Sequence, residues 1–149
     1  MDLEQQVSEL LKDAMKSGDK PRLTALRSIK SVLTNERTRH SGPLPEDDAF
    51  KVVASHRKKM DGAREQYADA GRDDMARQAE LEIEVCDQLL PERLSDEQLE
   101  AVVQSTITEV GAAGPGDIGK VMGPVMQKYG SQVEGDKVKE LVMRVLRGS

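Results

Sequence analysis

The sequence predicts an all-α protein, and three observations support this fold class. Leu, Val, Ile, Met and Ala recur every three to four positions through most of the 149 residues, as they do on one face of a helix. Aromatic residues make up only 2% of the chain, so aliphatic side chains must fill the core, as in helix bundles. No segment shows the alternation of apolar and polar residues that indicates a strand.

Residues 1–91 are predicted to form an N-terminal helical bundle of about four helices. Gly18, the proline-containing segment 41–45, Gly71 and Pro91 end these helices, because Pro disfavours helix continuation and Gly accepts the left-handed C-terminal conformation. The third helix is the longest and runs from about Glu46 to Ala70. The predicted buried faces are Leu3, Val7, Leu10, Leu11, Ala14 and Met15 in the first helix, Leu23, Leu26, Ile29, Val32 and Leu33 in the second, and Met75, Ala79, Ile83, Cys86 and Leu90 in the fourth.

Residues 92–149 are predicted to form a smaller C-terminal subdomain of three helices. Ser95 with Gln98 three positions later has the pattern of a capping box at the start of the first helix. The glycines of residues 111–116 end it, the second helix covers about residues 117–128, and Asp136 is expected to cap the third. The predicted buried faces are Leu99, Val102, Val103, Thr106, Ile107 and Val110, and Val138, Leu141, Val142, Val145 and Leu146.

The distribution of charge is more informative than its total. A net charge of −5 argues against indiscriminate nucleic-acid binding. Residues 20–40, however, contain six Lys and Arg residues and a single acid, Glu36, whereas residues 80–100 contain eight acids and one basic residue, Arg93. The second predicted helix is therefore a candidate basic surface, and the fourth a candidate acidic one.

No catalytic, metal or cofactor site is predicted. The glycine-rich segments do not follow strands, so they are not nucleotide-binding loops, and with one cysteine the isolated His40 and His56 give no zinc-ligand set. Cys86 lies on an otherwise apolar helical face and is interpreted as a core residue. The carboxylates Glu80, Glu84 and Asp87 fall on the opposite face and are interpreted as solvated rather than as an acid cluster.

The third predicted helix carries arginines on its apolar face. Arg57 and Arg64 project in the same sector as Val53 and Met60. One interpretation is that their stems pack in the core while the guanidinium groups reach solvent or pair with carboxylates such as Glu82. The other is a planar cationic site for phosphate.

Lysines next to these arginines extend the candidate basic surface. Lys58 and Lys59 point outward from the third helix, and Arg27, Lys30 and Arg37 lie beside the apolar stripe of the second. If these helices are neighbours, the residues would form one surface for sequence-independent phosphate binding.

Three segments of the chain resemble the YqeY-like family. They are RLTALRSIKSVLTNE (residues 22–36), QYADAGRDDMARQAELEIEVCDQLLPERLSDEQL (residues 66–99) and DIGKVMGPVM (residues 117–126). In the last segment, Gly119 and Gly123 share a helical face and would allow another backbone to approach closely, with Lys120 as its polar member. The family commonly has a Gly-Arg-Ala-Asp-Gly type sequence before its last helix, and the arginine is missing from residues 130–136 of this chain.

The resemblance implies an accessory role in tRNA binding. The family is related to the C-terminal tail of the B subunit of the tRNA-dependent Asp/Glu amidotransferase, and similar modules are fused to some glutaminyl-tRNA synthetases. The amidotransferase chemistry belongs to parts of that enzyme absent here, so the resemblance implies no active site. The candidate tRNA contacts are Arg27, Lys30, Arg57, Lys58, Lys59 and Lys120.

A protein-interaction adaptor is the alternative function. In it, the acidic residues 80–100 would meet a basic partner such as a tRNA synthetase or an amidotransferase. For either function we expect a cytoplasmic protein without a membrane segment, because no apolar run approaches the roughly 18 residues that cross a bilayer. The sequence leaves the tRNA species and the oligomeric state open.

Overall fold

The computed structural model describes residues 2–148 and confirms the all-α fold class. Over these residues the chain forms seven α-helices and one short 3₁₀ helix, and it forms no strand. The helices fall into two compact units, divided between Pro91 and Glu92. We call them unit 1 (Met1–Pro91) and unit 2 (Glu92–Ser149) and describe each by itself. None of the described helices combines the length and apolar composition that a bilayer-spanning segment requires.

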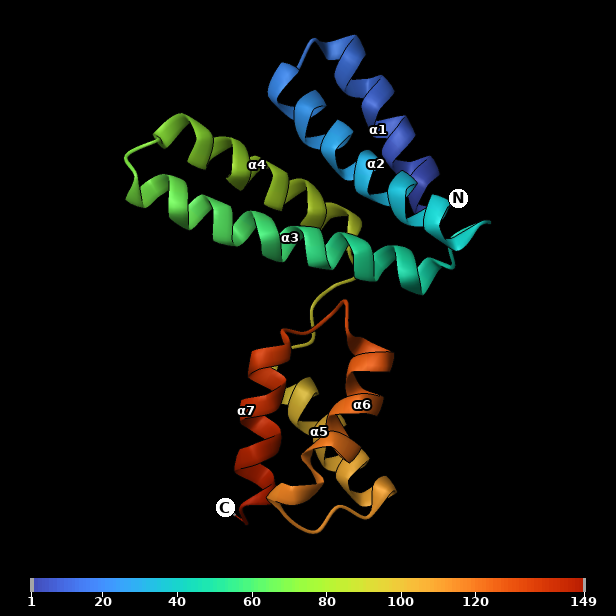
Figure 1. The fold of residues 1–149 in the computed structure, drawn as a ribbon, viewed down its shortest axis with the longest axis vertical. Helices are drawn as coiled ribbons and strands as arrows, with labels where there is room; N and C mark the ends of the chain where they lie inside the picture. Colours follow the sequence, from blue (N-terminus) through green and yellow to red (C-terminus); the bar gives the residue numbers. More distant parts are fainter. Residues whose placement is uncertain (1, 149) are drawn as a thin grey trace. The chain divides into compact units, whose positions relative to one another are not determined.

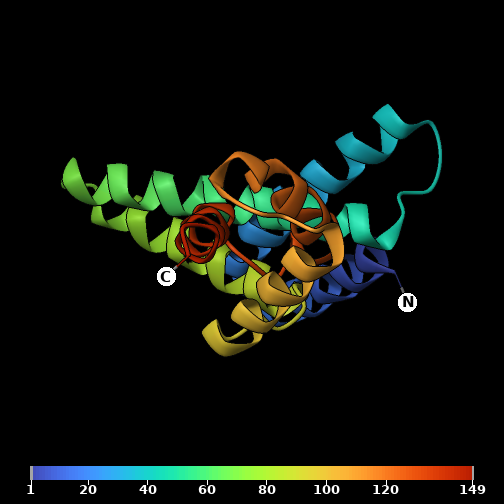
Figure 2. The ribbon, with the colours of Figure 1, turned by 90° about the horizontal axis from the view of Figure 1, so that it is seen from below.

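Unit 1 consists of two helical hairpins. The helices are α1 (Leu3–Ser17), α2 (Lys20–His40), α3 (Glu46–Asp69) and α4 (Asp73–Leu89). Figures 1 and 2 both show α3 and α4 side by side and antiparallel, and in Figure 1 the hairpin of α1 and α2 lies against them. Because α2 contacts α1, α3 and α4, it is the central helix of the unit.

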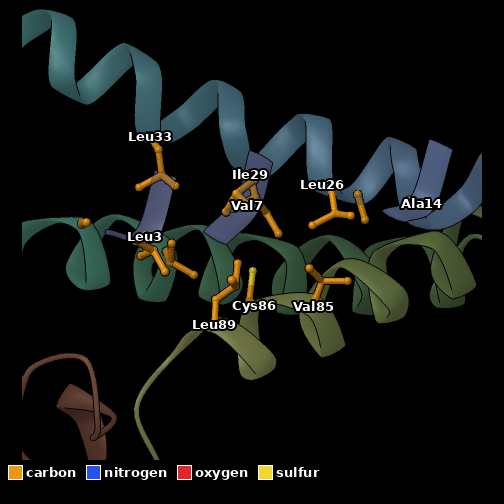
Figure 3. Packing of buried hydrophobic residues seen from close by; sticks show 12 residues of the cluster. Leu3, Val7, Ala14, Leu26, Ile29, Leu33, Val85, Cys86 and Leu89 are labelled. Atoms are coloured by element: carbon orange, nitrogen blue, oxygen red, sulfur yellow. The ribbon is translucent and has the colours of Figure 1, made fainter. Parts of the chain in front are cut away.

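The core of unit 1 is aliphatic and forms where the two hairpins meet. Leu26, Ile29 and Leu33 of α2 are fully buried, as the sequence predicted. Figure 3 shows these side chains above Val85, Cys86 and Leu89 of α4, with Leu3 and Val7 of α1 beside them. Val85 and Leu89 are buried although they lie outside the stripe predicted for α4. α4 therefore presents a wider apolar face to α2 and α3 than the predicted stripe.

Two methionines assigned to the core of unit 1 are on its surface. Met15 is 57% exposed and Met75 is 42% exposed, so both predictions are wrong. Met15 lies in the last turn of α1 and Met75 in the first turn of α4. Helical periodicity continues to the end of a helix, whereas burial stops where the neighbouring helix stops covering it.

Unit 2 consists of three α-helices around a core rich in valine. The helices are α5 (Asp96–Val110), η1 (Pro115–Asp117), α6 (Ile118–Tyr129) and α7 (Gly135–Leu146). The amide of Leu94 donates a 3.0 Å hydrogen bond to the carbonyl oxygen of Gln132, so the segment before α5 is fixed to the α6–α7 connection. The buried core residues are Leu99, Val103, Val121, Val125, Val138, Val142 and Leu146.

Helix ends in unit 2 confirm one prediction and correct two others. Ser95 and Gln98 form the predicted capping box. The N-cap of α7 is Glu134, which makes no side-chain capping hydrogen bond, so the prediction that Asp136 caps this helix is wrong. Asp136 lies inside the first turn, where a carboxylate still interacts favourably with the helix dipole. Val110, predicted to be buried, is 36% exposed in the last turn of α5.

The exposed face of α6 also differs from the prediction. Both Gly119 and Gly123 are exposed, and no neighbouring atom lies within 4 Å of the position that a Cβ atom would occupy at either. The close backbone approach predicted for these glycines does not occur within unit 2. The buried face of α6 is instead built on Val121 and Val125.

Candidate functional site

An open groove between α2 and α3 is the best candidate for a functional site in unit 1. It has a volume of about 450 Å³ and lies between the C-terminal half of α2 and the N-terminal half of α3. The side chains that line it come from residues 32–40 of α2 and 48–59 of α3: Val32, Asn35, Glu36, Arg39, His40, Asp48, Lys51, Val52, Ser55, His56 and Lys59.

Charged side chains dominate the rim of this α2–α3 groove. Glu36 is already paired, because Nη2 of Arg39 lies 2.9 Å from one of its oxygens and Nε2 of His40 lies 3.8 Å from the other. Among the described residues, no carboxylate is within ion-pair distance of Lys51 or Lys59. Lys51 and Lys59 are the unpaired cations of the groove among the described residues, and Asp48 is a carboxylate of its lining that is likewise unpaired.

A buried polar pair lies at the base of the groove. Nε2 of His56 is 2.6 Å from Oε1 of Glu82 on α4, and both side chains are more than nine-tenths buried. His56 is isolated in the sequence, but the fold gives it a partner from another helix. Its burial follows from its place on α3, three positions after Val53 on the face that packs against α4.

The second ring nitrogen of His56, Nδ1, keeps some contact with solvent. Among residues 2–148, the Nε2 contact with Glu82 is the one hydrogen bond that the His56 ring makes. Over the described residues, every fully buried side-chain nitrogen or oxygen has a partner. Nδ1 is therefore not fully buried, and His56 is one of the residues that line the groove. The ring thus connects the Glu82 carboxylate to the groove surface.

The predicted basic residues of α2 lie away from this groove. Arg27 and Lys30 are exposed and make no ion pair within the described chain. Lys30 precedes Arg37 by two helical turns, and Nε of Arg37 pairs with Glu4 of α1 at 2.9 Å, so Lys30 is on the flank of α2 that faces α1. α3 lies along the other flank, near Val32 and Glu36. The neighbouring helices therefore do not bring Arg27 and Lys30 into one surface with the lysines of α3.

The three adjacent basic residues of α3 have different surroundings. Arg57 is paired with Asp87 of α4, so its guanidinium is held by a carboxylate as in the structural interpretation, although the partner is not Glu82. Lys58 is exposed and does not line the groove, whereas Lys59 does. Consecutive residues differ in this way because each step along a helix turns the side chain by about 100°.

The second arginine on that face of α3 is also paired. Arg64 is bonded to Asp61 of the same helix. With both arginines held by carboxylates, the phosphate interpretation of the Arg57 and Arg64 pair loses its two cations.

Lys120 is the predicted contact in unit 2. Its side chain is 68% exposed, and its Nζ lies 3.5 Å from an oxygen of Asp117. A hydrogen bond from the amide of Ala113, together with the nearby Lys120, lowers the pKa of the Asp117 carboxyl. Lys120 is thus accessible, with part of its charge offset by an ionised neighbour.

The remaining candidate residues lie where the sequence predicted. Cys86 is fully buried, and in Figure 3 its sulfur points toward the side chains of α2. Burial, reinforced by the carboxylates of Glu82 and Asp87, raises the pKa of this thiol to about 12. Glu80, Glu84 and Asp87 are on the exposed face of α4. Within the described part of the chain, no three His, Cys, Asp or Glu residues are placed to hold a metal ion.

Comparisons with known proteins agree with the resemblance seen in the sequence. Residues 4–146 match the family model described as Yqey-like protein. The protein named "Altered inheritance of mitochondria protein 41, mitochondrial" from Pyrenophora tritici-repentis (strain Pt-1C-BFP) is 24% identical over 140 residues, which cover 91% of this chain and 76% of that protein.

Proposed function

The chain belongs to the YqeY-like family, and we propose that it is a non-catalytic accessory protein that binds tRNA. One observation carries this proposal. Six exposed cationic side chains on α2 and α3 of an acidic protein have no ion-pair partner within the described residues: Lys20, Arg27, Lys30, Lys51, Lys58 and Lys59. Unpaired lysines and arginines are the groups that neutralise phosphates in sequence-independent nucleic-acid binding.

The distribution of these residues on two surfaces fits an extended ligand. Lys30 is on the α1 side of α2, Arg27 is exposed on the same helix away from the groove, and the lysines of α3 are at or near the groove. A folded tRNA presents phosphates over a wide area, so it can contact separate basic surfaces at once. Net repulsion from the acidic remainder of the chain would keep binding weak and sensitive to salt.

The proposal places no reaction on this chain. The single thiol is buried, and its raised pKa disfavours the reactive thiolate. His56 is bonded to a carboxylate rather than to a nucleophile. A cytoplasmic location remains part of the proposal.

Reversal of charge on both basic surfaces tests the proposal. In the variant with Arg27, Lys30, Lys58 and Lys59 all changed to Glu, we expect tRNA binding to be lost, because each lost phosphate contact removes roughly 0.7 to 0.9 from the logarithmic salt slope and reversal adds repulsion. The helical circular dichroism signal and the unfolding midpoint should change little, since exposed substitutions cost within about 0.5 kcal/mol each. The measurement is a filter-binding assay with total tRNA at two salt concentrations.

A matched control separates local from overall charge. It reverses the same number of exposed lysines elsewhere, at Lys12 and Lys16 of α1 and Lys137 and Lys139 of α7, which gives the same net charge. This control should retain most of the tRNA binding. Equal loss in both variants, or no salt-sensitive binding by the wild type, would contradict the proposed function.

The adaptor hypothesis remains the second candidate because α4 exposes unpaired acids. Glu80 and Glu84 are exposed and have no ion-pair partner among residues 2–148. In a pull-down from lysate treated with ribonuclease, an adaptor would retain a tRNA synthetase or amidotransferase, and reversal of these two acids to Lys would release it. A tRNA-binding protein would lose its copurifying material on the same treatment.

A further inference from the structure

We propose that the groove between α2 and α3 binds a phosphate group, which Lys51 and Lys59 attract and to which His56, oriented by Glu82, donates a hydrogen bond from Nδ1. This inference rests on the proposed function and deepens it, because it assigns one particular phosphate of the bound nucleic acid to a built site. It also changes which residues are expected to contact the phosphate. Lys51 joins Lys59 in the site, and Lys58 does not belong to it.

The contact between His56 and Glu82 fixes how the imidazole ring meets the groove. An ionised carboxylate accepts hydrogen bonds and donates none, and in the arrangement proposed here Nε2 of His56 carries the hydrogen that it shares with Glu82. In the neutral ring Nδ1 is then an acceptor, which repels an anion. Protonation of Nδ1 converts it into a charged donor that faces the groove. Phosphate binding and protonation of His56 therefore favour each other.

The other charged groups around His56 favour an anion at this place. Glu82 of α4 contacts the ring, and the charged or titratable side chains that line the same groove are Asp48, Lys51 and Lys59 of α3 and Glu36, Arg39 and His40 of α2. Glu36 is held by Arg39 and His40, and Asp48 lies in the first turn of α3, where the helix dipole stabilises a carboxylate. The lysines are left with unpaired charge, and protonation of His56 adds to it.

The size of the groove indicates that the phosphate is part of a larger ligand. A volume of about 450 Å³ exceeds what one phosphate fills and is in the range of small-ligand sites. Val32 and Val52 give the lining an apolar part on which a ribose or base can lie. The phosphate is then either the terminal monophosphate of an RNA or an internal phosphodiester.

Sulfate titrations of the full chain test the site directly, because sulfate stays a dianion across the pH range used here. We expect Lys59→Ala to weaken sulfate binding about tenfold at pH 6, which corresponds to the loss of one charge-assisted contact. Lys58→Ala is the matched control, since it removes the neighbouring exposed lysine outside the groove, and it should stay within about twofold of wild type. NMR shifts of the His56 ring report binding at the proposed place.

The pH profile separates a donor role of His56 from a structural one. Wild-type sulfate affinity should rise about fivefold or more between pH 7.5 and pH 5.5, because only a protonated imidazole can donate to the anion while its other nitrogen donates to Glu82. His56→Gln should bind weakly and without this pH dependence, whereas His40→Gln should keep it. Glu82→Gln should shift the profile to lower pH, which a purely structural role of Glu82 would not do. Circular dichroism confirms that each variant is folded.

Two RNA probes distinguish the sources of the phosphate. A terminal phosphate predicts that a 5′-phosphorylated oligonucleotide binds more tightly than the same sequence with a 5′ hydroxyl, and that Lys59→Ala removes the difference. An internal phosphodiester predicts equal binding of the two, with both weakened by Lys59→Ala.

The failure of this inference differs from the failure of the proposed function. If tRNA binds with salt sensitivity while sulfate binding is absent or is unchanged by Lys59→Ala and His56→Gln, the groove site is overturned and the tRNA-binding proposal stands. If sulfate binds as expected but tRNA does not, the site stands as an anion site and the proposed function fails.

Discussion

The two units bury polar side chains in different ways. In unit 1, His56 of α3 and Glu82 of α4 satisfy each other across a helix–helix contact. In unit 2, Thr106 is the one buried polar side chain of the described residues, and its hydroxyl donates to the carbonyl oxygen of Val102 one turn earlier at 2.8 Å. The first arrangement depends on how two helices are placed, whereas the second is complete within α5.

The difference between the two kinds of hydrogen bond indicates which unit holds its helices in one fixed arrangement. A hydrogen bond within one helix does not fix the register between helices, so unit 2 relies on the shapes of its valines. If either helix shifts, a polar pair between helices is broken and a buried charge is left unpaired. The free-energy cost of that unpaired charge can favour a single placement of the two helices. We therefore expect unit 1 to be the more specifically ordered around its groove, and three predictions test the comparison.

The largest expected effect concerns Cys86, which reports on the interior of unit 1. Burial raises the pKa of its thiol from the usual 9.0 to about 12, so the thiolate fraction at pH 8 should be about a thousandfold lower in the folded than in the unfolded protein. Reaction with a thiol reagent should be slowed by at least that factor, because the side chain is also fully buried. Rapid labelling without denaturant would show that this interior opens readily.

An intermediate effect is expected from the buried pair of unit 1. Glu82→Leu removes one partner and should lower the free energy of unfolding by about 2 kcal/mol, because the ring nitrogen of His56 loses its acceptor. The double variant His56→Phe and Glu82→Leu should recover most of that loss, since two apolar groups can replace a satisfied pair. A double-mutant cycle from urea unfolding measures the coupling. Additive losses would mean that the pair does not order unit 1.

The smallest effect compares the capping boxes with which the two units begin. Asp2 and Gln5 form one at α1, and Ser95 and Gln98 form the other at α5. Replacement of Asp2 or of Ser95 by Ala should each cost about 1 kcal/mol in chemical unfolding, because one amide of the first turn loses its side-chain acceptor. If the two losses in free energy of unfolding differ, the stability of the unit with the smaller loss depends more on tertiary packing than on the cap of its first helix.

The presence of the helices was predictable from the sequence. The spacing of apolar residues and the Gly and Pro residues that end helices both depend on positions close together in the chain. The apolar stripe of α2, the Ser95 capping box and the buried Cys86 all follow from residues a few positions apart. The errors fall at helix ends. The apolar stripes continue into terminal turns at Met15, Met75 and Val110, where the side chains are exposed. The spacing of apolar residues does not indicate where burial by a neighbouring helix ends.

The candidate site was less predictable because it depends on contacts between distant segments. The burial of His56 was detectable, since it lies on one face of α3 with Ala49 and Val53. Its partner was not, because Glu82 is 26 positions away and is one of several acids on α4. The basic residues were found by composition, yet only the packing of α2 on α3 separates Lys59 from Lys58.

By itself, the sequence determined that this chain is helical, where most helices begin and end, which aliphatic residues form the cores and that positive charge concentrates on α2. Those properties depend on neighbours within a few turns of the same helix. The tertiary structure alone decided which cations remain unpaired, that Arg57 is held by Asp87, and that His56 joins Glu82 to a groove. A charge or a polar group takes its role from the groups packed beside it, and these come from helices that are remote in sequence.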